Sequence, residues 1–344
     1  MITARLKNRH SLIRTLACLL ILVGVCLGQG ALAERFYYLG SVGEQDVQVE
    51  LSLEGDSAAG HYYYDRVGVP LDLVGRVDSE GNVVLREFTR AGSPLGRQLT
   101  GTFTGKLSAS PNDYGSSFQG TWESPDGEVR PFDFTRAAEY VELNLGQGRI
   151  EARADYPFFL TPLDGLNRRL QTDVLTSSFD FVQEGQGYLL DGELYNGWTL
   201  QRELRLEYAS DSLVSISEIL YVYTGGAHGN TGLAGYTYVV ADGRTRSVRL
   251  ADLFKEDANY LAVLEPYILE QLLEQEAQWV VDGTLTLTDD DLSSFTVSPR
   301  GLTFGFEPYA VGPYAQGTFE VTVPFEVVAS VIDLEGPLER FLEE

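Results

Sequence analysis

From residue 34 to about residue 137, hydrophobic and polar residues alternate in short runs that turn sequences separate. The runs "QDVQVELSL", "GHYYYD", "LTGTFTGKL" and "SFQGTWES" are rich in β-branched and aromatic residues. Turn sequences such as "LEGDSA", "DSEGN" and "SPDGE" lie between them, which is typical of an antiparallel meander. About eight strands of this kind can close as a small up-and-down barrel or curl as an open sheet. We therefore predict an all-β domain over residues 34–137.

Residues 138–344 combine helical and strand patterns. The segment "PLDGLNRRLQTDVLTSSFDFV" predicts a helix, since four apolar residues recur on one face: Leu163, Leu166, Leu170 and Val174. The segment "DANYLAVLEPYILEQLLEQEAQWV" predicts a second helix with Asp257 as its N-cap. Its buried stripe would be Leu261, Leu264, Ile268 and Leu272. Strand-like runs surround both helices, and "ADGR" at 241–244 predicts a tight hairpin. We expect an α+β domain with helices packed on an antiparallel sheet.

The first 33 residues show the pattern of a secretory signal peptide. Basic residues precede the apolar run "LACLLILVGVCLGQ", and the small-residue sequence "ALA" follows at 31–33. We expect cleavage after Ala33, a periplasmic or secreted protein, and no membrane span after cleavage, because no later apolar run is long enough. Lipidation at Cys26 is disfavoured because Val25 occupies the position where a lipobox has Gly or Ala.

Net charge and cysteine content exclude several classes of function. Both cysteines, Cys18 and Cys26, lie in the predicted signal, so the mature chain would have no disulfide and no thiol nucleophile. Loss of the signal, with its four basic and no acidic residues, would change the net charge from −25 to −29. A chain with this negative charge is not expected to bind nucleic acid or anionic lipid. The charge is compatible with a cationic partner, or it serves only to keep the protein soluble.

The loop "YTGGAHGN" at 223–230 holds His228 among glycines. Gly225, Gly226 and Gly229 permit positive φ or close backbone approach. The loop lacks the Lys and Ser/Thr of a phosphate-binding loop, and two mature histidines without cysteines are too few for a zinc site. We predict no metal, no cofactor and no catalytic residue. His228 is expected to bond backbone groups within the loop, and a binding role is the alternative.

Three motifs carry a family resemblance. "YTGGAHGN", "LADLFKEDANY" and "EPYAVGPYAQGTFEVTVPF" occur in this order, and together they resemble the extracellular domain of RsiV-type anti-sigma factors, domain of unknown function 3298. The segment from "DYPFFLTPLDGLNRRL" onward is similar to the 4163-type companion of that domain. The resemblance covers about residues 138–335, with the companion at 138–212 and the motif-bearing part at 213–335. The domain at 34–137 resembles no family that we recognise.

The resemblance implies a binding module, because the best-understood member of the family binds lysozyme directly through this domain. These residues include neither a sigma-binding segment nor the metal-binding His and Asp of the deacetylases that carry the same domain, and no lysozyme contacts are transferred. We expect a non-enzymatic envelope protein that binds lysozyme, another cationic protein or a peptidoglycan-related glycan. Tyr309 and Tyr314 are candidate anchors, and packing of both into the core is the alternative. A polysaccharide hydrolase and a structural envelope protein remain alternative functions.

Overall fold

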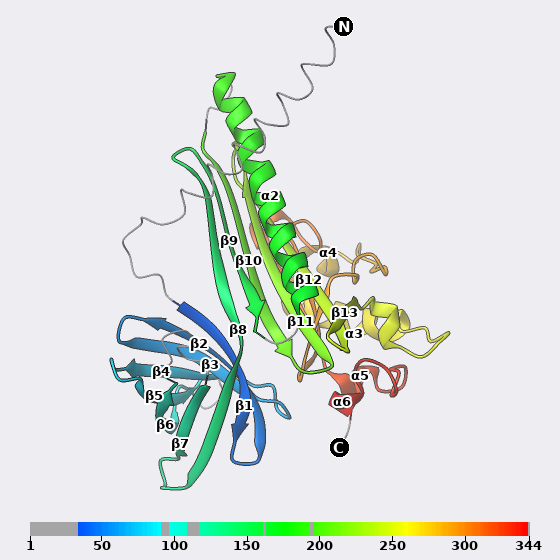
Figure 1. Cartoon of the computed structure of the whole chain (residues 1–344). Coiled ribbons are helices and arrows are strands. Elements are labelled where there is room, and N and C mark those ends of the chain that lie inside the picture. Colours follow the sequence, from blue (N-terminus) through cyan, green and yellow to red (C-terminus); the bar gives the residue numbers. More distant parts are fainter. Residues whose placement is uncertain (1–33, 91–95, 109–116, 161–162, 193–195, 343–344) are drawn as a thin grey trace, which may run out of the picture. The chain divides into compact units, whose positions relative to one another are not determined.

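The structure, a computed structural model, describes residues 34–90, 96–108, 117–160, 163–192 and 196–342 (Figure 1). The predicted signal peptide and its cleavage site therefore lie outside the described residues. No helix within the described residues has both the length and the apolar character needed to cross a bilayer.

Eight antiparallel strands form a closed barrel at the N-terminal end of the described chain. Each strand pairs with the next, and β8 pairs back with β1 from Phe36–Glu139 to Val42–Phe132, with a register shift between Tyr37 and Tyr38. The strands are β1 (Glu34–Val42), β2 (Gln45–Glu54), β3 (Ser57–Tyr64), β4 (Leu71–Val77), β5 (Asn82–Thr89), β6 (Leu99–Leu107), β7 (Ser117–Glu123) and β8 (Val129–Gln147). The predicted meander is confirmed, and of its two forms the chain adopts the barrel, which leaves no open sheet edge.

Aromatic side chains fill the barrel. Phe103, Phe118 and Phe134 are fully buried, and Phe118 meets Phe134 edge-on at a ring-centroid distance of 5.7 Å. One carboxylate lies among them: Glu87 is buried and accepts hydrogen bonds from the Tyr62 hydroxyl at 2.6 Å and the Trp122 indole at 2.7 Å. These two donors offset part of the cost of burying a polar group.

The barrel and the following sheet share one strand. β8 runs through the predicted domain boundary at 137 and 138, and its second half pairs with β9 (Ile150–Phe159) from Ala138–Phe159 to Gln147–Ile150. The sheet continues through β10 (Trp198–Ala209), β11 (Leu213–Tyr223), β12 (Asn230–Ala241) and β13 (Arg244–Ser247). The "ADGR" hairpin joins β12 to β13, with positive φ at Asp242 and Gly243.

The first predicted helix is confirmed as α2 (Asp164–Leu190), which packs on this sheet (Figure 1). All four residues of its predicted stripe are buried. Asn167 anchors the helix, because its side-chain amide exchanges two 2.8 Å hydrogen bonds with the backbone of Phe159 in β9. Since α2 brings the chain back along the sheet, β10 pairs with β9 in parallel, which departs from an entirely antiparallel sheet.

The C-terminal part is a smaller helix-and-sheet region. Its core contains Leu264, Ile268 and Leu272 of α3, packed among residues such as Phe304 and Val321 of the three-stranded sheet. Its elements are η1 (Leu250–Leu253), α3 (Leu261–Glu274), α4 (Gln278–Val281), β14 (Phe295–Ser298), β15 (Gly301–Phe306), η2 (Tyr314–Gln316), β16 (Phe319–Val323), α5 (Phe325–Val328) and α6 (Glu339–Leu342). The predicted α+β class is therefore confirmed.

The expected start of the second helix is wrong. Asp257 has φ of 63° and lies outside the helix, and Tyr260 occupies the N-cap position without a side-chain cap. A positive φ is typical of a turn residue and is not found within a right-handed helix. Asp257 therefore belongs to the turn before the helix.

Candidate functional site

The three residues that the sequence singled out for binding meet in one aromatic cluster, which we define as His228, Tyr309 and Tyr314. His228 lies in the loop between β11 and β12, and both tyrosines lie between β15 and β16. The His228 ring stacks on the Tyr314 ring with centroids 3.8 Å apart and planes at 22°. The Tyr309 ring lies 5.7 Å from Tyr314. The fold thus brings together residues that are some eighty positions apart in the chain.

A single carbonyl holds the cluster together. The Tyr314 hydroxyl donates to the Gly229 carbonyl at 2.8 Å, and Nδ1 of His228 lies 2.9 Å from the same oxygen as a donor. Gly229 has no room for a side chain, because an added Cβ would lie 2.4 Å from the Tyr221 ring. Gly225 and Gly226 have φ of 99° and 101°, values that glycine adopts without strain. The glycines thus position the loop, and His228 bonds within it.

The loop that carries the tyrosines is tightly held. The Gln316 side chain accepts a hydrogen bond from the Gln278 backbone N–H at 3.0 Å and donates one to the Glu276 carbonyl at 2.9 Å. Val311 and Gly312 are buried. Tyr309, by contrast, is 55% exposed and has φ of 74°, an uncommon value for a residue with a side chain. Such strain persists only where the surroundings enforce it. Tyr309 is therefore held outward by a well-packed loop, and Tyr314 is half-buried beneath it.

A second polar cluster, which sequence reasoning missed, surrounds Arg35 of β1. Its guanidinium pairs with Asp155 of β9 at 2.7 Å and Glu203 of β10 at 3.5 Å, and it lies 3.7 Å above the Tyr140 ring. Burial raises the pKa of the Asp155 carboxyl to about 6, Arg35 acts in the opposite direction, and neighbouring carboxylates including Glu142 add to the increase. The single guanidinium offsets part of the charge of these acids, and its contacts join the barrel strand β1 to β9 and β10.

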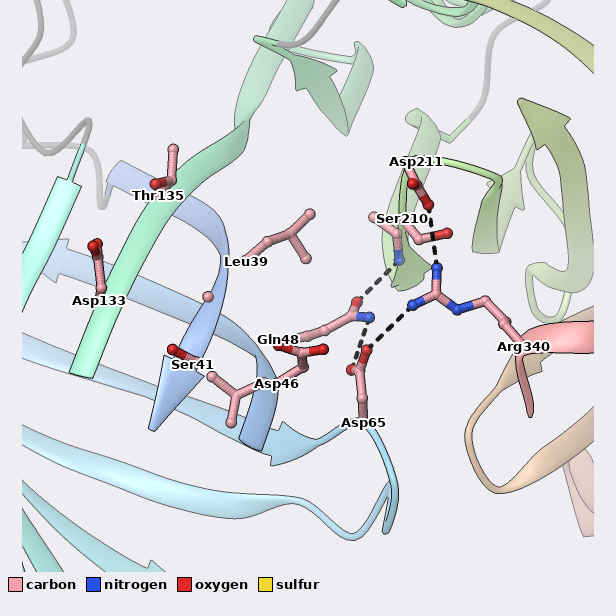
Figure 2. A pocket seen from close by; sticks show the side chains of 13 residues that line it. Leu39, Ser41, Asp46, Gln48, Asp65, Asp133, Thr135, Ser210, Asp211 and Arg340 are labelled. Carbon is pink, nitrogen blue, oxygen red and sulfur yellow. Dashed lines mark hydrogen bonds and ion pairs between the residues drawn. The ribbon is translucent and has the colours of Figure 1, made fainter. Parts of the chain in front are cut away.

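A third polar region is a cavity of about 450 Å³ beside the barrel wall (Figure 2). Asp46, Asp65, Asp133 and Asp211 are among the residues that line it. Arg340 of α6 reaches in, with its guanidinium 3.8 Å from Asp65 and 3.5 Å from Asp211. Burial raises the pKa of Asp65, while its bond from Gln48 and the charge of Arg340 act in the opposite direction.

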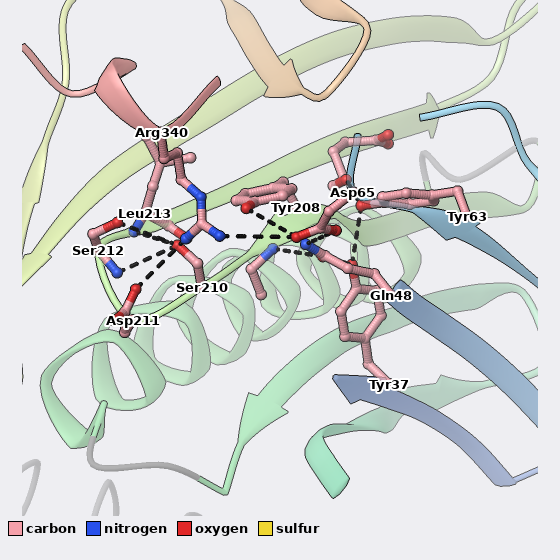
Figure 3. Close-up of polar contacts among 12 residues, drawn as sticks. Tyr37, Gln48, Tyr63, Asp65, Tyr208, Ser210, Asp211, Ser212, Leu213 and Arg340 are labelled. Atoms are coloured by element: carbon pink, nitrogen blue, oxygen red, sulfur yellow. Dashed lines mark hydrogen bonds and ion pairs between the residues drawn. The ribbon is translucent and has the colours of Figure 1, made fainter. Parts of the chain in front are cut away.

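Hydrogen bonds around this cavity connect the barrel to the end of β10 (Figure 3). The buried Gln48 side chain accepts bonds from Tyr37 and from the Ala209 backbone N–H, and it donates to Asp65 at 3.0 Å. The Tyr63 hydroxyl donates to the Glu207 carbonyl at 2.8 Å. These contacts fix two parts of the fold against each other. No sequence motif pointed to them, because they join residues far apart in the chain.

Among the residues that the structure describes, no group of three or more His, Cys, Asp or Glu side chains could hold a metal ion. Chemically, the aromatic cluster offers exposed ring surface and hydrogen-bonding groups, which are contact features of a binding surface.

Comparison with known proteins gives a family match for part of the chain. Residues 251–326 match the model of the protein family of unknown function DUF3298. The matched segment includes Tyr309 and Tyr314 and begins well after His228. No curated protein matches this chain.

Two similar solved structures are DUF3298 proteins. One, from Pseudomonas aeruginosa, is 17% identical, with a TM-score of 0.45, covering 57% of this chain and 94% of its own. The other, from Bacteroides fragilis, is also 17% identical, with a TM-score of 0.44, covering 60% of this chain and 98% of its own.

Proposed function

We propose that this protein is a non-enzymatic binding protein of the bacterial cell envelope, and that the aromatic cluster contacts a basic protein partner of the lysozyme type. The observation that carries the proposal is the exposure of Tyr309 on a rigid loop, beside the stacked rings of His228 and Tyr314. Interface hot spots are enriched in Tyr, and a rigid anchor loses little conformational entropy on binding. The RsiV-type resemblance of the motifs supports the same partner.

Charge supports a basic partner. The chain carries 50 acidic and 25 basic residues, and a cationic protein would be steered toward it. This steering raises the association rate and is screened by salt over about 8 Å at physiological ionic strength. Specificity would come from Tyr309, because the contact that it makes is short-ranged and largely independent of salt.

The hydrolase alternative depends on carboxylates with raised pKa values that converge in a cleft. Asp155 and Asp65 have raised pKa values, but the closest charged partner of Asp155 is the Arg35 guanidinium, and Asp65 contacts the Gln48 amide and the Arg340 guanidinium. Glu203, the other acid near Arg35, is also paired with Arg205 at 2.6 Å. The surroundings of these carboxylates therefore support a binding function over a hydrolase.

A peptidoglycan-related ligand for the same aromatic cluster stays an alternative to the basic protein.

Titration calorimetry of the chain from Glu34 with an animal-type lysozyme, at low and moderate salt, tests the proposal. We expect binding to survive moderate salt and Tyr309→Ala to weaken it at least about tenfold, as expected for a hot spot. Tyr188→Ala is the control, because Tyr188 is 42% exposed on α2, lies outside the aromatic cluster and packs on Trp198. Binding that disappears with salt, or that cytochrome c reproduces, would reduce the proposal to charge attraction.

A further inference from the structure

The second half of β8 leaves one edge of the second sheet open. Ala138 and Glu139 pair with β1 and with β9 at the same time, so these two strands lie on opposite sides of β8. From Tyr140 to Gln147, β8 pairs with β9 alone among the described strands, and this part of β8 lies at the margin of the sheet (Figure 1). On the side of β1, its backbone N–H and C=O groups therefore have no strand partner within the described residues.

The two edges of this sheet differ in their protection. At the far edge, β13 is only four residues long and carries Arg244 and Arg246, and short, charged edge strands resist the addition of another strand. The segment Val141–Leu145 of β8 contains no Lys, Arg or Pro, and its only charged residue is Glu142. Its pairing with β9 has no bulge, and it begins two residues beyond Glu139, where the pairing with β1 ends. This segment, which we call the open edge, is able to accept another strand.

Apolar side chains border the open edge on the α2 side of the sheet. Arg202 of β10 contacts Asp173 and Ser177 on one flank of α2. Leu175 is two residues from each, about 200° around the helix, so it lies on the other flank, towards β8. Leu175 is 41% exposed. Three half-buried residues of the open edge add to this apolar border: Val141, Leu143 and Leu145.

The open edge is complementary to itself. If two copies pair antiparallel about a two-fold axis at Leu143, Val141 of one copy lies opposite Leu145 of the other. Glu142 then lies opposite Asn144, on the exposed side of the sheet. The only carboxylate of the open edge thus faces an amide that donates a hydrogen bond to it, and not a second carboxylate. Apolar residues face apolar residues on the α2 side.

From this geometry we propose that the open edge of β8 is a homodimer interface, across which two copies join their second sheets into one continuous sheet. Main-chain hydrogen bonds hold the two strands together, and the two Glu142–Asn144 contacts fix their register. A foreign strand would gain the same main-chain bonds, but a second copy supplies both halves of the side-chain match by symmetry. This inference goes beyond the proposed function, because it assigns a different partner to a different surface.

Sedimentation equilibrium of the chain from Glu34, over a range of concentrations, measures the dissociation constant of the dimer. Asn144→Glu should raise this constant at least about tenfold, because a carboxylate would then face Glu142 at two places in the dimer. Asn144→Lys should lower it, since an ammonium group would face the same carboxylate. Asn144 is exposed, so both variants should keep the fold, and thermal melts check that they do.

Gln201→Glu and Gln201→Lys are the matched controls. Gln201 is exposed on β10, two strands in from the open edge, and strand pairing places it on the same face as Asn144. The controls make the same changes in net charge, so they report any general repulsion between two acidic copies. Both should keep the wild-type dissociation constant.

Leu143→Cys tests the register. The chain from Glu34 has no cysteine of its own, so any disulfide must join two copies at this position. Directly opposed residues of antiparallel strands have Cβ atoms about 5 Å apart, a spacing that a small shift brings within disulfide range. Mild oxidation should convert Leu143→Cys to a covalent dimer and leave Gln201→Cys monomeric.

Three outcomes would overturn the inference: the wild type is a monomer even at sub-millimolar concentration, the two Asn144 variants dimerise as the wild type does, or the Gln201 variants shift the dissociation constant as strongly. Tyr309→Ala should leave dimerisation intact, and Asn144→Glu should leave lysozyme binding intact. If the chain is monomeric and Asn144→Glu weakens lysozyme binding, the open edge belongs to the interface with the basic protein and not to a homodimer. Failure of either proposal is thus distinguishable from failure of the other.

Discussion

At the scale of single residues, His228 makes its contacts inside its own loop and with Tyr314. His228→Ala would remove the stack on Tyr314 and the hydrogen bond to Gly229. Because the side chain is exposed, we expect the free energy of unfolding to fall by only about 1 kcal/mol. Urea unfolding measures the change, and His228→Gln, which keeps a donor, should recover part of it. Unchanged stability together with lost ligand binding would instead give His228 a direct binding role.

Asp155 gives a residue-scale prediction about pH. Its folded pKa of about 6 lies above the ordinary value of 3.8, so the folded state holds this proton more tightly than the unfolded state does. The stability that it contributes is therefore complete below about pH 4 and is lost as the pH rises through about 6. Arg35 from β1 opposes the shift, and Glu50, Glu142 and Glu203 from β2, β8 and β10 strengthen it.

Asp155→Asn should remove this pH dependence. Relative to the variant, the wild type is expected to lose about 1 kcal/mol between pH 4 and pH 7, a figure reduced for partial solvent exposure. Denaturant unfolding at both pH values measures the difference, and Asp180→Asn, an exposed residue of α2, is the control. Parallel stability curves for the wild type and Asp155→Asn would contradict the prediction.

At the scale of elements, β8 and α2 decide where the functional surfaces lie. β8 is nineteen residues long, so its first half closes the barrel and its second half begins the sheet. α2 covers one face of that sheet and anchors there through Arg202 of β10, which donates to Asp173 at 2.7 Å and Ser177 at 2.6 Å. The C-terminal region packs on the opposite face through β14.

At the scale of the whole molecule, the barrel has its own closed hydrogen-bonding network and its own aromatic core. We predict that a fragment of residues 34–137 folds alone, because the pairs from Tyr38–Arg136 to Val42–Phe132 still close it. Such a fragment should show a β-type circular dichroism spectrum and a cooperative melt. Its outer wall would lose the contacts that Tyr37, Gln48 and Tyr63 make beyond the barrel, so its melting temperature should be lower than that of the whole chain.

One result would contradict the prediction that residues 34–137 fold alone. A molten or aggregated product would mean that the barrel and the sheet depend on one another. A second fragment, ending at Gln147, keeps all of β8 but exposes an unpaired strand edge from Tyr140 onward, which favours association. If only this longer fragment is soluble and cooperative, the boundary at 137 is misplaced.

The amino-acid sequence alone determined the strands of the barrel, the first long helix and the loop glycines, since each depends on local periodicity or local backbone freedom. The buried stripe from Leu163 to Val174 and the hairpin at Asp242 and Gly243 belong to this class. Asp257 shows where prediction from local sequence fails. Aspartate is common both at helix N-caps and in turns, and only its backbone φ in the structure distinguishes the two positions.

Tertiary structure alone decided which residues meet. The sequence selected His228, Tyr309 and Tyr314 singly, and only packing of the β11–β12 loop against the β15–β16 connection stacks them. The Arg35 cluster and the cavity at Arg340 carry no sequence motif at all. The first depends on strand register and the second on where α6 packs, and both are set by long-range contacts that a local pattern does not encode.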